Sequence, residues 1–198
     1  AFATLPSPYG PASSSGPFAG WITAEPGGTA LTGFTTIGNV DDRLYRDPLN
    51  GSPMAQLATL AGNFTARYFD GTAYASANSA GLTGSVNAIW EVDLSGNNLH
   101  EEIISIGGFS AGFDFDAAGN LYVATAANTF SPDPNDPVTA NQLLRFDSAD
   151  IFDPLRTAPL ELADATVLAD LPSSGNDVAV DDAGNVFVSS SNFFDQIE

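Results

Sequence analysis

The sequence lacks cysteine and has few basic residues. Its 198 residues include no Cys, one His, one Met and only five Lys or Arg. The absence of cysteine excludes disulfides, thiolate metal sites, iron–sulfur ligation and a cysteine nucleophile. The single histidine, His100, also excludes a metal site built from several histidines of one chain.

Acidic residues dominate the charge. The 24 Asp and Glu against five basic residues give a formal net charge of −19. Such a surface repels phosphate backbones and anionic lipids, which argues against nucleic-acid binding and electrostatic membrane docking. Cations or a basic partner protein are favoured instead. The alternative is a solvated acidic coat that keeps the protein soluble in a salty or extracellular medium.

No apolar run approaches the roughly 18 residues that suggest a membrane span. The chain begins at Ala1 without an initiator Met, and "AFA" suits the region around a signal-peptidase site. We therefore expect a secreted protein, extracellular, periplasmic or at the cell surface, whose signal peptide has been removed.

A repeat of 46 residues runs through the first two thirds of the chain. The matched landmarks, each pair 46 residues apart, are Asp47 and Asp93, Gly62 and Gly108, and Asp70 and Asp116. Later copies are longer: Asp181 follows Asp116 by 65 residues, with insertions at 129–141 and 148–164 that are rich in Pro and Asp, as surface loops are. A short helical turn is expected near 148–152. Three landmarks with one period indicate a tandem repeat.

Each repeat reads as four short strands. "GFDFD" alternates apolar and polar residues, "NLYVAT" and "NVFVSS" are β-branched and aromatic runs, and "AIWEVDL" and "EEIISIGG" supply the third and fourth strand types. In "DAAGN" and "DDAGN", Asp116 and Asp181 have the chemistry of hairpin turns, with a glycine supplying positive φ. Four strands in about 46 residues predict an all-β fold, a β-propeller with four-stranded antiparallel blades.

The predicted organisation has an arm and three and a half blades. The arm, 1–19, is rich in Pro, Ser and Gly; the blades span about 20–62, 66–108, 112–172 and, incomplete, 176–198. Closed propellers usually have about four to eight blades. Either the N-terminal segment completes a small four-bladed ring, or the chain belongs to a larger propeller; we favour the larger propeller.

Two hairpins carry a family resemblance. "GFDFDAAGNLYVAT" and "NDVAVDDAGNVFVSS" resemble the inner hairpins of NHL-repeat propellers and of the related SMP-30/gluconolactonase and strictosidine-synthase-like propellers. The gluconolactonase-type resemblance implies a metal-ligating Asp at Asp177, or Asn176, together with a Glu from an early blade and two Asn residues around a calcium ion. Glu25 matches that Glu poorly, and neither Asn can be placed.

Two acidic clusters are candidate calcium sites, because hard oxygen ligands suit that ion and a cation relieves the repulsion between carboxylates. The candidate ligands are Asp133, Asn135 and Asp136 in the loop "SPDPNDP", and Asp177, Asp181 and Asp182 around the last hairpin. The alternative is that both clusters are solvated loops, with Asp116 and Asp181 acting as turn formers.

These observations favour a secreted, non-catalytic binding or structural propeller, stabilised by calcium, whose ligand is a protein or small molecule at the propeller face. One alternative is a calcium-dependent hydrolase or lactonase of the gluconolactonase type. A second is a subunit of an extracellular assembly in which a neighbouring chain completes the unfinished blade.

Overall fold

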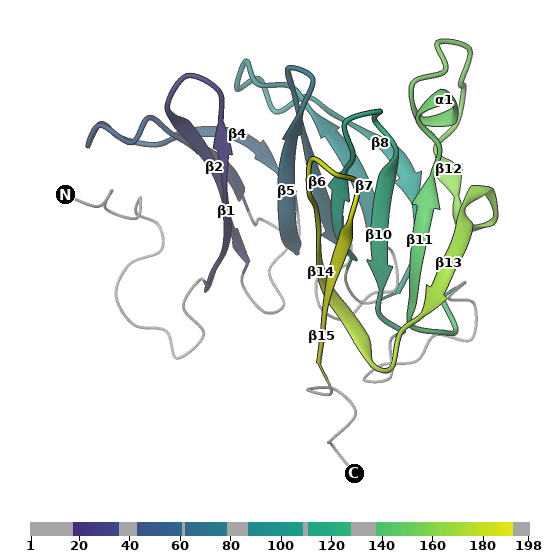
Figure 1. Cartoon of the computed structure of the whole chain (residues 1–198). Coiled ribbons are helices and arrows are strands. Elements are labelled where there is room, and N and C mark those ends of the chain that lie inside the picture. The colour runs from purple at the N-terminus through teal and green to yellow at the C-terminus, as the bar shows by residue number, and fades with distance from the viewer. Residues whose placement is uncertain are drawn as a thin grey trace.

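The chain forms short antiparallel sheets, as the computed structural model shows (Figure 1). The structure describes residues 18–35, 43–60, 62–78, 87–108, 111–127 and 138–191. The prediction of an all-β fold with four-stranded antiparallel sheets is confirmed. Among the described residues, no helix has the length and apolar character needed to cross a membrane.

Three sheets each contain four antiparallel strands, and a two-stranded hairpin follows them. Sheet A holds β1 (Phe18–Glu25), β2 (Thr29–Thr35), β3 (Arg43–Asp47) and β4 (Ala55–Thr59). Sheet B holds β5 (Asn63–Phe69), β6 (Thr72–Asn78), β7 (Asn87–Val92) and β8 (His100–Ser105). Sheet C holds β9 (Ala111–Phe115), β10 (Leu121–Thr125), β11 (Gln142–Phe146) and β13 (Thr166–Asp170). Hairpin D consists of β14 (Ser174–Val180) and β15 (Val186–Ser191).

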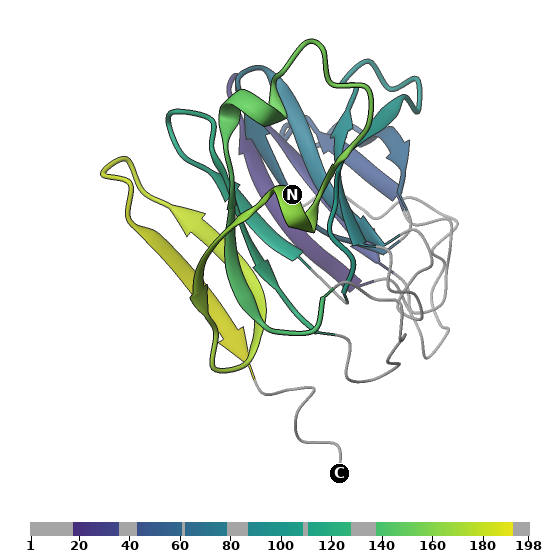
Figure 2. The same cartoon turned by 90° about the vertical axis from the view of Figure 1, so that its right-hand side faces the viewer.

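The first strands of consecutive units lie against one another. Strand β1 contacts β5, β5 contacts β9, and β9 contacts β14. Sheets A, B and C follow one another as layers in chain order, from purple to green (Figure 1). In the turned view, the yellow hairpin D lies at one side of the molecule, next to the green strands of sheet C (Figure 2).

Sheet B is buried on both faces. One apolar cluster lies between sheets A and B and includes Leu31, Leu44 and Leu57, together with small alanines of β5 and β6. A second, more aromatic cluster lies between sheets B and C and includes Phe115 and Leu121. These two layers of apolar side chains hold the three sheets together by burying surface that would otherwise contact water.

The 46-residue repeat places equivalent side chains in contact. Phe69 ends β5 and Phe115, 46 positions later, ends β9; their rings stack with centroids 4.6 Å apart. Tyr74 adds a tilted ring whose centroid lies 4.9 Å from that of Phe115. Equivalent positions of sheets B and C therefore meet in one aromatic core, an arrangement that offset aromatic pairs favour.

The insertion after β11 reaches back to sheet B. It contains the short helix α1 (Ser148–Ile151), at the position of the predicted helical turn, then β12 (Leu160–Glu161) and the 3-10 helix η2 (Leu162–Asp164). Strand β12 pairs in parallel with β8, so sheet B has a fifth strand supplied by the connection within sheet C. The composition of the insertion predicts a surface loop, and nothing in its sequence indicates this pairing.

Hairpin D packs very closely on sheet C. A Cβ at Gly112 would lie 2.2 Å from the Cα of Asp177, and a Cβ at Gly175 would lie 2.6 Å from the Cβ of Ala124. Glycine at both positions therefore allows β9 and β10 to approach β14. The first strands are close enough for their side chains to form one polar cluster.

Candidate functional site

The repeated Asp-x-x-Gly-Asn segments form closed turns. Asp116 Oδ1 accepts the backbone N–H groups of Ala118 and Asn120, both at 2.9 Å, and its Oδ2 accepts the Asn120 amide at 2.8 Å. Asp181 repeats this pattern with Ala183 and Asn185 at 2.8–3.0 Å. The prediction that both aspartates form turns is confirmed.

The glycines and the electrostatics fit the same role. Gly119 and Gly184 have φ of 85° and 80°, as predicted for these turns. Hydrogen bonds, first of all from the Asn185 side chain, lower the pKa of Asp181. At Asp116 burial acts in the opposite direction, but hydrogen bonds from Asn120, Ala118 and Tyr122 outweigh it and lower the pKa. Both carboxylates are therefore stabilised in their charged form by the turn itself.

Asp177, a predicted metal ligand, forms an ion pair with an arginine instead. Arg67 Nη2 lies 2.9 Å from Asp177 Oδ1, and Arg67 Nε lies 3.4 Å from Asp114 Oδ1. The second oxygen of Asp114 accepts the backbone N–H of Val180 at 2.9 Å. The three charged side chains come from β5, β9 and β14, the first strands of sheets B and C and hairpin D.

The cluster is largely withdrawn from solvent. The side chains of Arg67 and Asp114 are 18% and 22% exposed, while that of Asp177 is 53% exposed. Arg67 also donates to the carbonyl oxygens of Val178 and Ala66 and to Thr65 Oγ1. Because the Arg67 guanidinium is bound by both backbone carbonyls and carboxylates, we interpret this cluster as a polar contact that joins sheet B, sheet C and hairpin D.

The predicted ligands of the last hairpin do not converge. Asp177 lies within β14, whereas Asp181 and the exposed Asp182 lie in the turn that follows it. Four residues of strand separate Asp177 from Asp181, which corresponds to about 13 Å between their Cα atoms. Across the described ranges, no group of three His, Asp or Glu residues is arranged to hold a metal ion. Asp133, Asn135 and Asp136 lie outside the described residues.

Glu25, the poorly matching candidate of the early blade, is also paired. Its buried carboxylate accepts Arg46 Nε at 2.8 Å and Nη2 at 2.7 Å, and the Thr29 hydroxyl at 2.8 Å. Hydrogen bonding to Glu25 raises the pKa of Arg46. Arg46 also donates to the carbonyl of Leu94 at 3.3 Å, which connects sheet A to the turn after β7.

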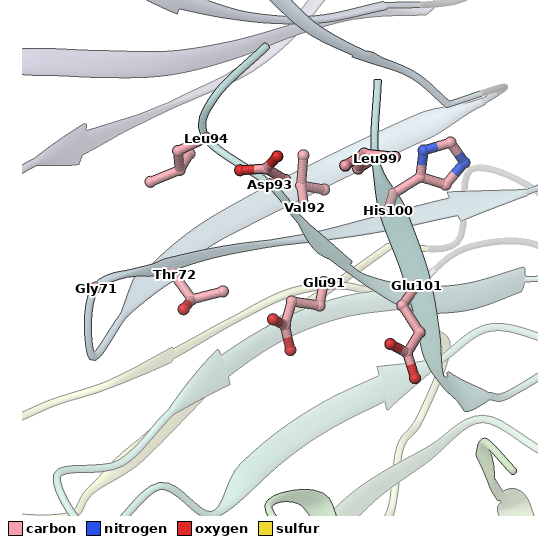
Figure 3. A pocket seen from close by; sticks show the side chains of 9 residues that line it. All are labelled: Gly71, Thr72, Glu91, Val92, Asp93, Leu94, Leu99, His100 and Glu101. Atoms are coloured by element: carbon pink, nitrogen blue, oxygen red, sulfur yellow. The ribbon is translucent and has the colours of Figure 1, made fainter. Parts of the chain in front are cut away.

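An acidic cleft opens at the β7–β8 end of sheet B (Figure 3). Its volume is about 520 Å³, and its lining residues are Gly71, Thr72, Glu91, Val92, Asp93, Leu94, Leu99, His100 and Glu101. Glu91 and Glu101 are directly opposite in the β7–β8 register, and their carboxylates extend in the same direction (Figure 3). Like charges opposite each other on a sheet are destabilising, so the cleft favours a cationic group.

Tyr74 is directly opposite Glu91, one of the residues that line the cleft. Burial, and after it the charge of Glu91, raises the pKa of Tyr74 to about 12. His100 is exposed, and its ring meets the ring of Trp90 edge-on with centroids 5.3 Å apart. No sequence motif indicates this cleft, because Glu91 and Glu101 meet only through strand pairing.

Sequence reasoning also missed Arg46 and Arg67. The scarcity of basic residues was the available signal: with five basic residues against 24 acidic ones, each arginine has many possible partners and is a candidate for a specific structural role.

Comparisons of the chain with protein-family models, with curated proteins and with solved structures find no match.

Proposed function

We propose that the chain is part of an NHL-like β-propeller that acts outside the cell as a non-catalytic binding module. The observation that carries the proposal is the contact between the first strands of successive antiparallel sheets. In a propeller, successive four-stranded blades surround a central channel. The contacts β1–β5, β5–β9 and β9–β14, with each sheet running outward in chain order, support this arrangement.

The proposed binding surface is the acidic cleft. Glu91 and Glu101 extend to one side of the β7–β8 pair, whereas Asp93 and the exposed ring of His100 lie on its other side (Figure 3). The chain has a net charge of −19, so long-range attraction favours cationic ligands at every part of the surface, and the cleft adds a concave place to hold one. The proposed ligand class is therefore a cationic group of a small molecule or of a basic protein.

Calorimetric titration with spermidine tests the cleft. We expect the Glu91→Gln/Glu101→Gln variant to bind at least about tenfold more weakly than the original chain, a loss of about 1.4 kcal/mol. The matched control is Asp150→Asn/Asp182→Asn, which removes two exposed charges elsewhere. Equal affinity of both variants would show that binding follows net charge and not the cleft.

Calcium binding remains part of the proposal, on the loop that contains Asp133, Asn135 and Asp136. A ligand that binds only the folded state must raise the melting temperature. We expect calcium chloride to raise it more than sodium chloride of equal ionic strength, and a chelator to reverse the rise. The Asp133→Asn/Asp136→Asn variant should lose the effect; a chelator-insensitive melting temperature would contradict a calcium site.

We assign no reaction to the protein. The gluconolactonase-type alternative requires carboxylate and amide oxygens that meet on a cation. Asp177, the ligand that the resemblance implies, is held by Arg67, and Glu25 is held by Arg46. Neither pairing favours a catalytic metal, so the binding module is the function that the geometry supports best.

A role as a subunit of an assembly is favoured by exposed apolar side chains on the last units. Val167 and Leu168 of β13 are 53% and 43% exposed, and Phe187 of β15 is 58% exposed. Exposed apolar patches often mark protein–protein contacts. Sedimentation analysis tests this role: Phe187→Ser should reduce concentration-dependent association. Leu49→Ser, at an equally exposed site in the turn between β3 and β4, should not. Equal sedimentation of both variants would argue against assembly through hairpin D.

A further inference from the structure

Two polar side chains in the middle of sheet B are completely buried. Ser76 of β6 and Asn87 of β7 are 0% exposed. In the part of the chain that the structure describes, Ser76 Oγ, Asn87 Nδ2 and Asn87 Oδ1 have no hydrogen-bond partner. Buried polar groups in native proteins are almost always paired, with protein or with ordered water, so these three atoms require an explanation.

The two side chains lie on the same face of the sheet. Ser76 pairs across the strands with Ile89, and Asn87 precedes Ile89 by two residues. Positions two apart on a strand point to the same side, and Ile89 belongs to the apolar cluster between sheets B and C. Ser76 and Asn87 are therefore diagonal neighbours, with Cα atoms about 7–8 Å apart, inside that interface.

The neighbouring polar groups are already satisfied. The backbone carbonyl of Asn87 accepts the N–H groups of Ile106 and Gly107 at 2.9 and 2.8 Å, from the connection between β8 and β9. Thr65, opposite Ser76, accepts Arg67 Nη1 at 2.8 Å. The backbone of Asn87 is thus held in place, and the Thr65 hydroxyl oxygen is already bound by Arg67.

The chemistry of the orphaned atoms selects the ligand. Asn87 Nδ2 and the Ser76 hydroxyl can donate, so the ligand must accept hydrogen bonds; Asn87 Oδ1 only accepts, so the ligand must also donate. A metal cation cannot accept, and the Arg67 guanidinium on the same face disfavours it further. We propose that an internal water molecule bridges Ser76 and Asn87 and completes the polar end of the interface between sheets B and C. This proposal does not rest on the propeller, because it concerns two neighbouring sheets only.

Thermal unfolding of four variants tests the bridge: Asn87→Leu, Ser76→Ala, their combination and one control. Bridged and unpaired side chains predict effects of opposite sign for Asn87→Leu. If water satisfies both side chains, Asn87→Leu removes its own bonds and disrupts those of Ser76, and should lower the melting temperature by about 4–8 °C. The Ser76→Ala/Asn87→Leu double variant should lose less than the sum of the single changes, because both residues share one water. Ser189→Ala, an exposed serine on β15, is the control and should leave the melting temperature unchanged.

If the three atoms are unpaired in solution, Asn87→Leu raises the melting temperature and the two changes add, which overturns the proposal. A high-resolution crystal structure of the unaltered chain gives a readout that does not depend on the variants folding. The expected result is an ordered water within hydrogen-bonding distance of Ser76 Oγ and the Asn87 amide. A dry site, or a protein group bonded to that amide, overturns the proposal.

Discussion

Three of the arginines connect different sheets. All five basic residues of the chain are arginines. Arg46 connects sheet A with the turn after β7, and Arg67 connects β5 with β9 and β14. Arg156, in the insertion of sheet C, donates to the carbonyl of Ile103 in β8 at 3.4 Å. A guanidinium offers five donors in a rigid plane, so one side chain can bind groups of several strands at once.

Removing the central arginine should destabilise the fold. Arg67→Met keeps much of the side-chain volume but leaves Asp114 without its cation and the carbonyl of Val178 without its donor. Because both charges are mostly buried, we expect a loss of about 1–3 kcal/mol in the free energy of unfolding, measured with urea. Arg145→Met is the control, since its ion pair with Asp147 is 35% and 49% exposed and should be worth at most about 1 kcal/mol. Equal losses of unfolding free energy in the two variants would contradict a structural role of Arg67 between the sheets.

The turn aspartates should make the protein sensitive to acid. The pKa of Asp116 and that of Asp181 are lowered in the fold, so the folded state binds fewer protons than the unfolded state in the same pH range. Their contribution is complete above the unfolded pKa, about 3.9, and is lost as the pH falls through the folded values. The melting temperature should therefore fall steeply below about pH 4.

The Asp116→Asn/Asp181→Asn variant should show a shallower decline with acid, because asparagine keeps an oxygen acceptor for the turn but does not titrate. Asp182→Asn serves as the comparison. It removes one charge from the second turn but leaves the hydrogen bonds that Asp181 accepts from Ala183 and Asn185. If the double variant and the original chain decline in parallel between pH 5 and pH 2, the turn carboxylates are not the source of the acid sensitivity.

Equivalent positions of the repeat form equivalent turns at the ends of strands. Asp47 ends the third strand of sheet A, and Asp93, 46 residues later, directly follows the third strand of sheet B. Each accepts the backbone N–H group two residues later, at 2.8 and 2.9 Å. The Asp70–Gly71 hairpin differs: it has only two turn residues, with φ of 44° and 89°. The period therefore records the turns after the strands, while the turn length varies between copies.

The approach of hairpin D to sheet C should depend on Gly112. In Gly112→Ala the new methyl group would overlap the backbone of Asp177, so β14 must move away, at a cost of at least about 1–3 kcal/mol. Gly184→Ala strains only the turn, since nothing lies within 4 Å of its Cβ position. Limited proteolysis should cut residues 174–191 faster in Gly112→Ala than in Gly184→Ala; equal rates would contradict this close contact.

At the scale of the whole molecule, negative charge opposes the folded state. A net charge of −19 on 198 residues creates self-repulsion that salt screens. The Debye length falls from about 30 Å at 0.01 M salt to about 3 Å at 1 M. We expect the melting temperature to rise steadily with sodium chloride and equally with choline chloride. A rise confined to one cation would indicate a specific ion site in place of general screening.

The sequence by itself determined what depends on local chemistry. The four-strand pattern, the Asp and Gly residues of the turns and the short helix at Ser148–Ile151 all follow from residues close together in the chain. Hydrogen bonds within a turn and alternation along a strand are set by neighbours in sequence, and these predictions are confirmed.

Only the tertiary structure decided which distant side chains meet. Arg67 is 110 residues from Asp177, and Glu91 meets Glu101 through the strand register. Strand β12 joins β8 across more than fifty residues of chain. Each of these contacts depends on how sheets pack, and composition gives many acidic candidates for every arginine. The sequence therefore predicted Asp177 as a possible cation ligand, whereas the packing of three first strands supplied it with an arginine.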